Sequence, residues 1–140
     1  MFLVPVNYFS VVIAALVSML TGFIWYGPLF GKQWMKLAGI TEKQMEAARK
    51  GMNGKYLTMF VSSAVMAYVL FHFIWFTKPG SYNLTVGLKT AVWAWLGFVA
   101  TTSLSGYLFG AEKKPWELYV LDNAFRLVSL LFMAAVLVLI

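Results

Sequence analysis

Long apolar runs separated by short polar segments make up most of this chain. Four runs, at about 4–26, 56–76, 84–109 and 116–140, each reach the roughly 20 apolar residues that a helix needs to cross a bilayer core of about 30 Å. Gly-Pro, Pro-Gly and Lys-Pro pairs lie between them and favour helix ends for steric reasons. Backbone groups inside a bilayer must be satisfied within the element, and the runs are too long and continuous for barrel strands. We therefore predict an all-α, integral membrane four-helix bundle that forms a single four-span domain over residues 1–140.

The first connection, at about 27–55, is the only sizeable polar segment. Its stretch TEKQMEAARKG predicts a short amphipathic helix, in which Thr41 is the N-cap, Gln44 completes a capping box and Gly51 ends the helix. The basic residues of this segment allow two interpretations, a solvated connector or a contact with anionic lipid headgroups.

Composition supports the membrane assignment. Of the 140 residues, 61% are hydrophobic and only 11% are charged, whereas a soluble domain carries about a quarter charged residues. The net charge of +6 does not predict nucleic-acid binding, because the basic residues gather in short connections between apolar runs. The chain has no cysteine, which excludes disulfides and thiolate metal ligands.

The basic residues also predict an orientation. The second connection holds Lys78, with Lys89 just inside the third run, whereas connections one and three hold eight basic residues. The eight are Lys32, Lys36, Lys43, Arg49, Lys50, Lys55, Lys113 and Lys114. By the positive-inside rule, connections one and three face the cytoplasm, and the N- and C-termini lie on the outer side.

Small residues recur at helical spacing in two of the runs. The series is Ala14, Ser18 and Gly22 in the first run, and Ala94, Gly97, Thr101 and Ser105 in the third. Small side chains let helix backbones approach closely in lipid, where packing drives association. We interpret both series as helix-packing faces, within the chain or between copies. The alternative is that they line a polar cavity.

The fourth run contains a polar triplet, Asp122, Asn123 and Arg126. Asp122 and Arg126 are four residues apart, so both lie on one helical face. With a rise of about 1.5 Å per residue, Arg126 lies about 15 Å from Trp116, near the middle of a bilayer. An isolated charge at that depth costs at least about 2.5–3.5 kcal/mol on insertion scales, so the triplet needs a structural or a functional explanation.

Both explanations stay open from the sequence. In the structural one, Asp122 and Arg126 form an internal ion pair that hydrogen-bonds to neighbouring helices and fixes their register. In the functional one, the triplet lines a wet cavity, where it binds a small polar or anionic solute or relays a proton. In both, the expected partners on other helices are Thr101, Ser105 and Asn7.

No catalytic constellation accompanies the triplet. The sequence has no metalloprotease, nucleophile-elbow or phosphate-loop motif. The single histidine, His72, has no cysteine or nearby carboxylate with which to hold a metal, so we interpret it as an interfacial residue among aromatic neighbours. Asp122 is the one carboxylate deep within a run, at membrane depth, which leaves no two-carboxylate mechanism within the chain. We therefore predict a protein that is not an enzyme and that has no cofactor and no metal site.

Four segments of the chain, in their order, are similar to those of a known family. They are VNYFSVVIAALVSMLTGFIWYGPLFGKQWMKLAGIT, VMAYVL, GFVATTSLSGYLF and KPWELYVLDNAFRLVSLLFMAAVL. The most specific part is WYGPLFGK, a loop signature that contains Trp25, Tyr26, Gly27, Pro28 and Lys32. Over nearly all 140 residues the chain resembles the bacterial membrane proteins grouped as domain of unknown function 1761. The resemblance implies a compact four-span membrane protein and no particular activity, and we expect it in the bacterial cytoplasmic (inner) membrane.

Two functional hypotheses from different classes follow. The first is a non-enzymatic protein that binds or permeates a small polar or anionic solute at the triplet. The second is a structural or accessory subunit of a larger membrane complex, in which the triplet is an internal ion pair. The expected partners are the lipid bilayer and either a second copy or a larger membrane complex, without nucleic acid, and the sequence does not specify a small-molecule ligand.

Overall fold

The computed structural model describes residues 3–80 and 82–140. Helices, with two π-helical turns, account for all the regular structure of these residues, and no strand occurs among them. The elements are α1 (Tyr8–Ile24), η1 (Trp25–Leu29), α2 (Gly31–Ala38), α3 (Glu42–Arg49), α4 (Met52–Thr77), α5 (Leu84–Ala94), η2 (Trp95–Ala100), α6 (Thr101–Phe109) and α7 (Trp116–Leu139). The predicted all-α fold is therefore confirmed.

Four helical segments are long and apolar enough to cross a membrane. They are Tyr8–Leu29, Met52–Thr77, Leu84–Phe109 and Trp116–Leu139, and they coincide closely with the four apolar runs of the sequence. By length and composition the chain is thus a multi-pass membrane protein.

The first connection between these segments contains two short helices. In α3, the Thr41 hydroxyl accepts from the Gln44 N–H and the Gln44 side chain accepts from the Thr41 N–H, so the predicted capping box is confirmed. Gly51 follows α3 with a φ of 73°, a left-handed conformation that suits glycine. The other short helix, α2, was not predicted, and it ends at Gly39 with a φ of 70°.

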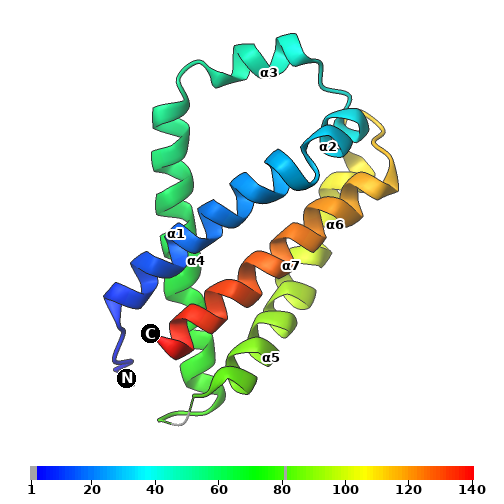
Figure 1. The fold of residues 1–140 in the computed structure, drawn as a ribbon. Helices are drawn as coiled ribbons and strands as arrows, with labels where there is room; N and C mark the ends of the chain where they lie inside the picture. Colours follow the sequence, from blue (N-terminus) through cyan, green and yellow to red (C-terminus); the bar gives the residue numbers. More distant parts are fainter. Residues whose placement is uncertain (1–2, 81) are drawn as a thin grey trace.

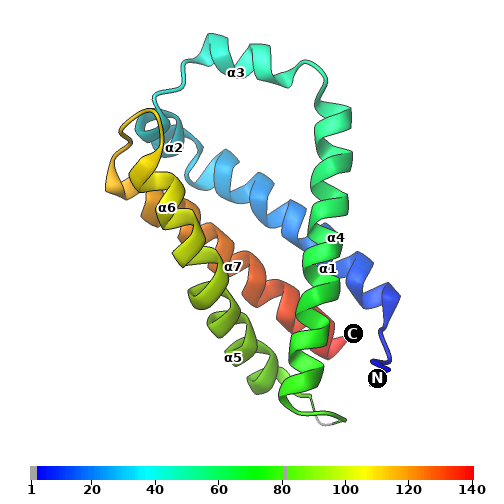
Figure 2. The same cartoon turned by 180° about the vertical axis from the view of Figure 1, so that it is seen from behind.

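The bundle is built around α7, which packs against α1 on one side and α5 on the other, while α4 packs against α1 (Figure 1). The N-terminal segment, the α4–α5 connection and the C-terminus lie at one end of the molecule, and α2, α3 and the α6–α7 connection lie at the other (Figures 1 and 2). We call these the terminal end and the connection end.

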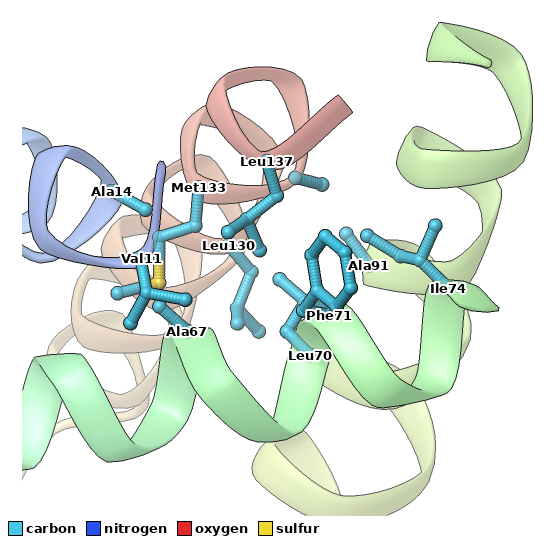
Figure 3. Packing of buried hydrophobic residues seen from close by; sticks show 11 residues of the cluster. Val11, Ala14, Ala67, Leu70, Phe71, Ile74, Ala91, Leu130, Met133 and Leu137 are labelled. Carbon is cyan, nitrogen blue, oxygen red and sulfur yellow. The ribbon is translucent and has the colours of Figure 1, made fainter. Parts of the chain in front are cut away.

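The hydrophobic core lies toward the terminal end (Figure 3). Its buried members come from α1, the second half of α4, α5 and the second half of α7: Val11, Ala14, Ala67, Leu70, Phe71, Ile74, Ala91, Leu130, Met133, Ala134 and Leu137. Toward the connection end α4 diverges from α1 and α7, and α3 spans the separation (Figures 1 and 2). The four long helices are therefore packed together at the terminal end, whereas α4 stands apart from the other three at the connection end.

Small residues allow the close approaches in the packed part. Ala14 is fully buried in α1, and a Cβ added at Gly22 would meet the Phe125 ring of α7 at 3.5 Å. At Gly87 of α5, an added Cβ would lie 2.8 Å from Cγ2 of Val138. Gly97, which the sequence assigned to helix packing within the chain or between copies, lies on the outer surface, where an added Cβ would meet no neighbouring helix within 4 Å.

The first span does not end at Gly27-Pro28, as the sequence suggested, but continues through both residues as η1. Proline lacks an N–H and its ring clashes with the carbonyl four residues back, which breaks a regular α-helix. The wider π-helical turn accommodates Pro28, and the Phe30 N–H bonds to the carbonyl of Trp25, five residues back, at 2.9 Å. A second π-helical segment, η2, divides the third span into α5 and α6.

The two basic connections meet at the connection end. The Lys114 ammonium donates to the carbonyl of Ala38, the last residue of α2, at 2.8 Å, where a cation complements the helix dipole. The same ammonium lies 3.0 Å from the Glu112 carboxylate and holds the pKa of that carboxyl below its usual range. Lys114 thus ties the α6–α7 connection to the first connection.

Candidate functional site: a cleft beside the polar triplet of α7

The structure separates the triplet into two parts. Asp122 and Arg126 do not form the expected ion pair, and the one ion pair among the described residues joins Lys114 to Glu112. The four-residue spacing places both Cβ atoms on one face of α7, but it does not determine where the long arginine side chain points. Asp122 and Asn123 bond to neighbouring helical segments, whereas Arg126 points into a cleft.

Asp122 is bound by the first π-helical turn. The Tyr26 hydroxyl donates to Oδ1 of Asp122 at 2.6 Å, a short distance that fits a charge-assisted hydrogen bond. The Tyr26 ring packs edge-on against the rings of Phe125 and Trp34, with centroid distances of 5.0 and 5.5 Å. These contacts fix the orientation of the Tyr26 side chain. The partner of Asp122 is therefore a phenol from η1, one of the residues in the loop signature.

Asn123 is bound by the second π-helical turn and the helix after it. Its side chain is 3% exposed, and its Oδ1 accepts from the Ser103 hydroxyl of α6 at 2.8 Å. Its Nδ2 donates to the Tyr119 carbonyl at 3.0 Å, while its own carbonyl accepts from Nε1 of Trp95 at 2.9 Å. The Tyr119 hydroxyl donates to the Ala100 carbonyl at 2.7 Å, which adds a second link from α7 to η2. Both π-helical turns are thus fastened to adjacent residues of α7.

The partners predicted from the sequence lie elsewhere. Thr101 and Ser105 are exposed, and the Thr101 hydroxyl donates to the carbonyl of Gly97 in its own helix. Each π-helical turn holds an extra residue, which rotates the following helix by about 100° relative to a constant period of 3.6. The rotation at η2 directs Ser103, in place of Thr101 and Ser105, toward α7. Asn7 is the N-cap of α1 at the terminal end, where its amide donates to the Ile140 carbonyl at 3.3 Å.

Arg126 points into a cleft of about 490 Å³ between α1, α4 and α7, a volume within the usual range for small-molecule sites. Six hydroxyl-bearing residues line it: Ser18, Tyr26, Tyr56, Ser62, Ser63 and Ser129. Arg126 is the one charged residue in the lining, and its exposed side chain makes no hydrogen bond or ion pair with any residue that the structure describes. The Ser18 and Ser129 hydroxyls bond to each other at 2.8 Å and join α1 to α7 at the cleft wall.

An apolar groove of about 350 Å³ continues from this cleft toward the terminal end. Cleft and groove share Met66, Val99 and Leu130 as lining residues. The remaining lining of the groove is entirely apolar and comes from α4, α5 and η2: Val69, Leu70, Phe73, Ala94 and Phe98. A single continuous depression therefore runs from a cationic end to an apolar end.

The sequence missed Tyr26, Trp95 and Ser103 as partners of the triplet. Tyr26 lies in the loop signature, but its role depends on the π-helical continuation of α1 past Pro28, which a constant helical period does not predict. Within the same signature, Gly27 and Pro28 form part of η1, Lys32 is exposed on α2, and Trp25 packs on Phe30 with ring centroids 4.7 Å apart.

His72, the other titratable side chain considered from the sequence, lies outside the cleft. Nδ1 of His72 is 2.8 Å from the Tyr68 carbonyl, and its ring packs on Tyr68 and Phe76 with centroid distances of 4.4 and 6.2 Å. No group of three or more His, Cys, Asp or Glu residues suited to a metal ion occurs within residues 3–80 and 82–140. The chemistry that the cleft offers is therefore one guanidinium among hydroxyls.

Comparison with known proteins identifies the family. The family model described as a protein of unknown function (DUF1761) matches residues 9–138, nearly the whole chain. The chain belongs to this family. No curated protein and no solved structure matches it.

Proposed function

We propose that this member of the DUF1761 family is a non-enzymatic membrane protein that binds a small, negatively charged ligand in the cleft between α1, α4 and α7, with Arg126 as the anion-binding group. Asp122 and Asn123, the other members of the triplet, hold the helices that surround the cleft. The observation that carries the proposal is the exposed Arg126 side chain in a cleft whose lining contains hydroxyls but no acid.

The position of Arg126 makes this arrangement costly without a ligand. The residue lies ten positions into α7, so it is about 15 Å from the start of the helix at a rise of about 1.5 Å per residue. Insertion scales assign such a charge a cost of at least about 2.5–3.5 kcal/mol near the centre of a bilayer. A bound anion would offset that cost, and the planar guanidinium suits carboxylate and phosphate oxygens in a bidentate geometry.

The proposed location is the bacterial cytoplasmic membrane, with the connection end in the cytoplasm and both termini on the outer side. Eight basic residues in the first and third connections support this orientation. The cleft lies in the half of the bundle nearer the connection end, because its α4 lining begins at Tyr56, close to the start of that helix. In this orientation a ligand would enter from the cytoplasmic side or from the cytoplasmic leaflet.

Native mass spectrometry of the protein extracted in mild detergent tests the proposal. We expect a bound mass on the wild-type protein that is lost in Arg126→Gln, because glutamine keeps polar atoms but removes the charge. Lys89→Gln is the matched control, since Lys89 is an exposed cation of a membrane span that lines neither the cleft nor the groove. This variant should retain the mass.

Two outcomes would contradict the proposal. One is a bound mass that persists unchanged in Arg126→Gln. The other is a wild-type protein isolated with a stoichiometric protein partner and no small ligand, which would favour an accessory subunit of a larger complex.

A further inference from the structure

We infer that the ligand is an anionic membrane lipid, whose phosphate binds Arg126 in the cleft while one acyl chain lies in the apolar groove. This inference rests on the proposed function and specifies its ligand class. It follows from the shape of the depression and the apolar lining of its groove, which are independent of the charge on Arg126.

The depression has two chemically distinct ends that are joined. The cleft carries the guanidinium and six hydroxyl-bearing residues, whereas the groove beyond it is lined by apolar side chains. Met66, Val99 and Leu130 belong to both linings, so a ligand can cross from one to the other without leaving the protein surface. A small inorganic anion would leave the groove unfilled, while a ligand with a charged head and an apolar tail fills both.

The groove is long enough for much of an acyl chain. Along α4 its lining runs from Met66 to Phe73, seven residues, or about 10 Å at about 1.5 Å per residue. An acyl chain that crosses half of a bilayer core covers about 15 Å. Tyr56, at the other end of the cleft, lies only four residues from the start of α4, where a headgroup would reach the interface.

Charge argues against a second copy of this chain as the occupant. The cleft needs an anion at the depth of Arg126, and Asp122 is the carboxylate at a similar depth in α7. Asp122 already accepts the hydrogen bond of Tyr26 within its own chain. A phosphate of a membrane lipid, by contrast, is available in any leaflet with anionic lipid.

Selectivity must come from the headgroup. Phosphatidylglycerol and phosphatidylcholine of the same chain length present the same acyl chain to the groove, so the chain does not distinguish them. The phosphate–guanidinium contact, in surroundings of low dielectric constant, distinguishes lipids by their net charge. We therefore expect the protein to select phosphatidylglycerol, which is anionic, over zwitterionic phosphatidylcholine of the same chain length.

Competition in vesicles tests the inference. Delipidated protein is reconstituted in equimolar phosphatidylglycerol and phosphatidylcholine, extracted in mild detergent and examined by native mass spectrometry. We expect phosphatidylglycerol adducts to exceed phosphatidylcholine adducts by about tenfold, the ratio that one charge-assisted hydrogen bond supports. Arg126→Gln should abolish the preference, and Arg126→Lys, which keeps the charge, should retain part of it and serves if the glutamine variant does not fold.

A second pair of variants tests the chain site. Val69→Trp places a bulky ring in the groove, while Val65→Trp places the same ring on an exposed position of α4 that lines neither depression. Val69→Trp should lose most of the lipid adduct and Val65→Trp should keep it. Equal retention of both lipids by the wild-type protein, or a lipid adduct unchanged by Val69→Trp, would overturn the inference.

Glycerol 3-phosphate, the headgroup without acyl chains, separates this inference from the proposed function. If it binds the wild-type protein and not Arg126→Gln, while the two lipids are retained equally, the anion site stands and the lipid assignment is wrong. If neither probe responds to Arg126→Gln, both proposals are wrong. Binding of glycerol 3-phosphate to Val69→Trp as to the wild type is expected, because the groove holds only the acyl chain.

Discussion

Asn123 is the most connected polar side chain of the triplet. It is buried against η2 and α6, and it pairs its amide with the Ser103 hydroxyl and the Tyr119 carbonyl. Asp122 is half-buried and is held by the Tyr26 hydroxyl. Neighbouring residues in one helix therefore differ: Asp122 and Asn123 fasten helices, whereas Arg126 lines the cleft.

Loss of the Asn123 amide should destabilise the bundle. We expect Asn123→Ala to lower the free energy of unfolding by about 1–2 kcal/mol, because interhelical hydrogen bonds in membrane proteins contribute about that much at most and the Ser103 hydroxyl loses an acceptor. Ser105→Ala, at an exposed position of the same helix α6, should change it by less than about 0.5 kcal/mol. Unfolding titrations with SDS, followed by circular dichroism, measure both. Equal stability of the two variants would contradict the role given to Asn123.

Sequence reasoning at this scale identified the triplet but not its partners. The cost of burying polar groups in lipid made Asp122, Asn123 and Arg126 stand out. The ion pair was wrong because helical spacing fixes the positions of Cβ atoms and leaves the arginine rotamer free. Tyr26 satisfies Asp122 from another helix, and no local pattern in the sequence predicts that contact.

At the scale of elements, the two π-helical turns decide which side chains meet α7. The spans were predictable because a bilayer demands a minimum length of apolar helix. The π-helical turns were not, since an extra residue changes the helical phase without changing hydrophobicity. The predicted stripe through Thr101 and Ser105 was wrong for this reason, as η2 rotates Ser103 onto the α7 side.

The turn after Pro28 depends on a glycine. An added Cβ at Gly31 would lie 2.7 Å from the Tyr26 carbonyl oxygen, a backbone atom that can move only if η1 moves. We expect Gly31→Ala to destabilise the protein by about 1–3 kcal/mol, as overpacked sites do. Gly27→Ala, in the same turn with nothing within 4 Å, should change stability by less than about 1 kcal/mol in either direction. The same SDS titration tests the pair, and a Gly31→Ala variant no less stable than Gly27→Ala would contradict the close approach.

At the scale of the molecule, α4 packs with the other long helices at the terminal end and diverges from them toward the connection end (Figures 1 and 2). The buried core lies at the terminal end, and the cleft lies toward the connection end. The groove joins the two, since Leu70 and Leu130 line it and also belong to the core. Composition and span count predicted a four-helix bundle. The divergence of α4 was not predictable, because apolar side chains face lipid and protein alike and the hydrophobic pattern does not distinguish them.

Arg126 faces an accessible cleft, whereas Asn123 is buried between helices. The chain contains no cysteine, so single cysteines at these two positions report on access directly. In delipidated protein in mild detergent, Arg126→Cys should react with a charged, water-soluble thiol reagent, and Asn123→Cys should react only after unfolding in SDS. If folded Asn123→Cys reacts as fast as Arg126→Cys, Asn123 is not buried between helices. If Arg126→Cys does not react before unfolding, Arg126 does not face an accessible cleft.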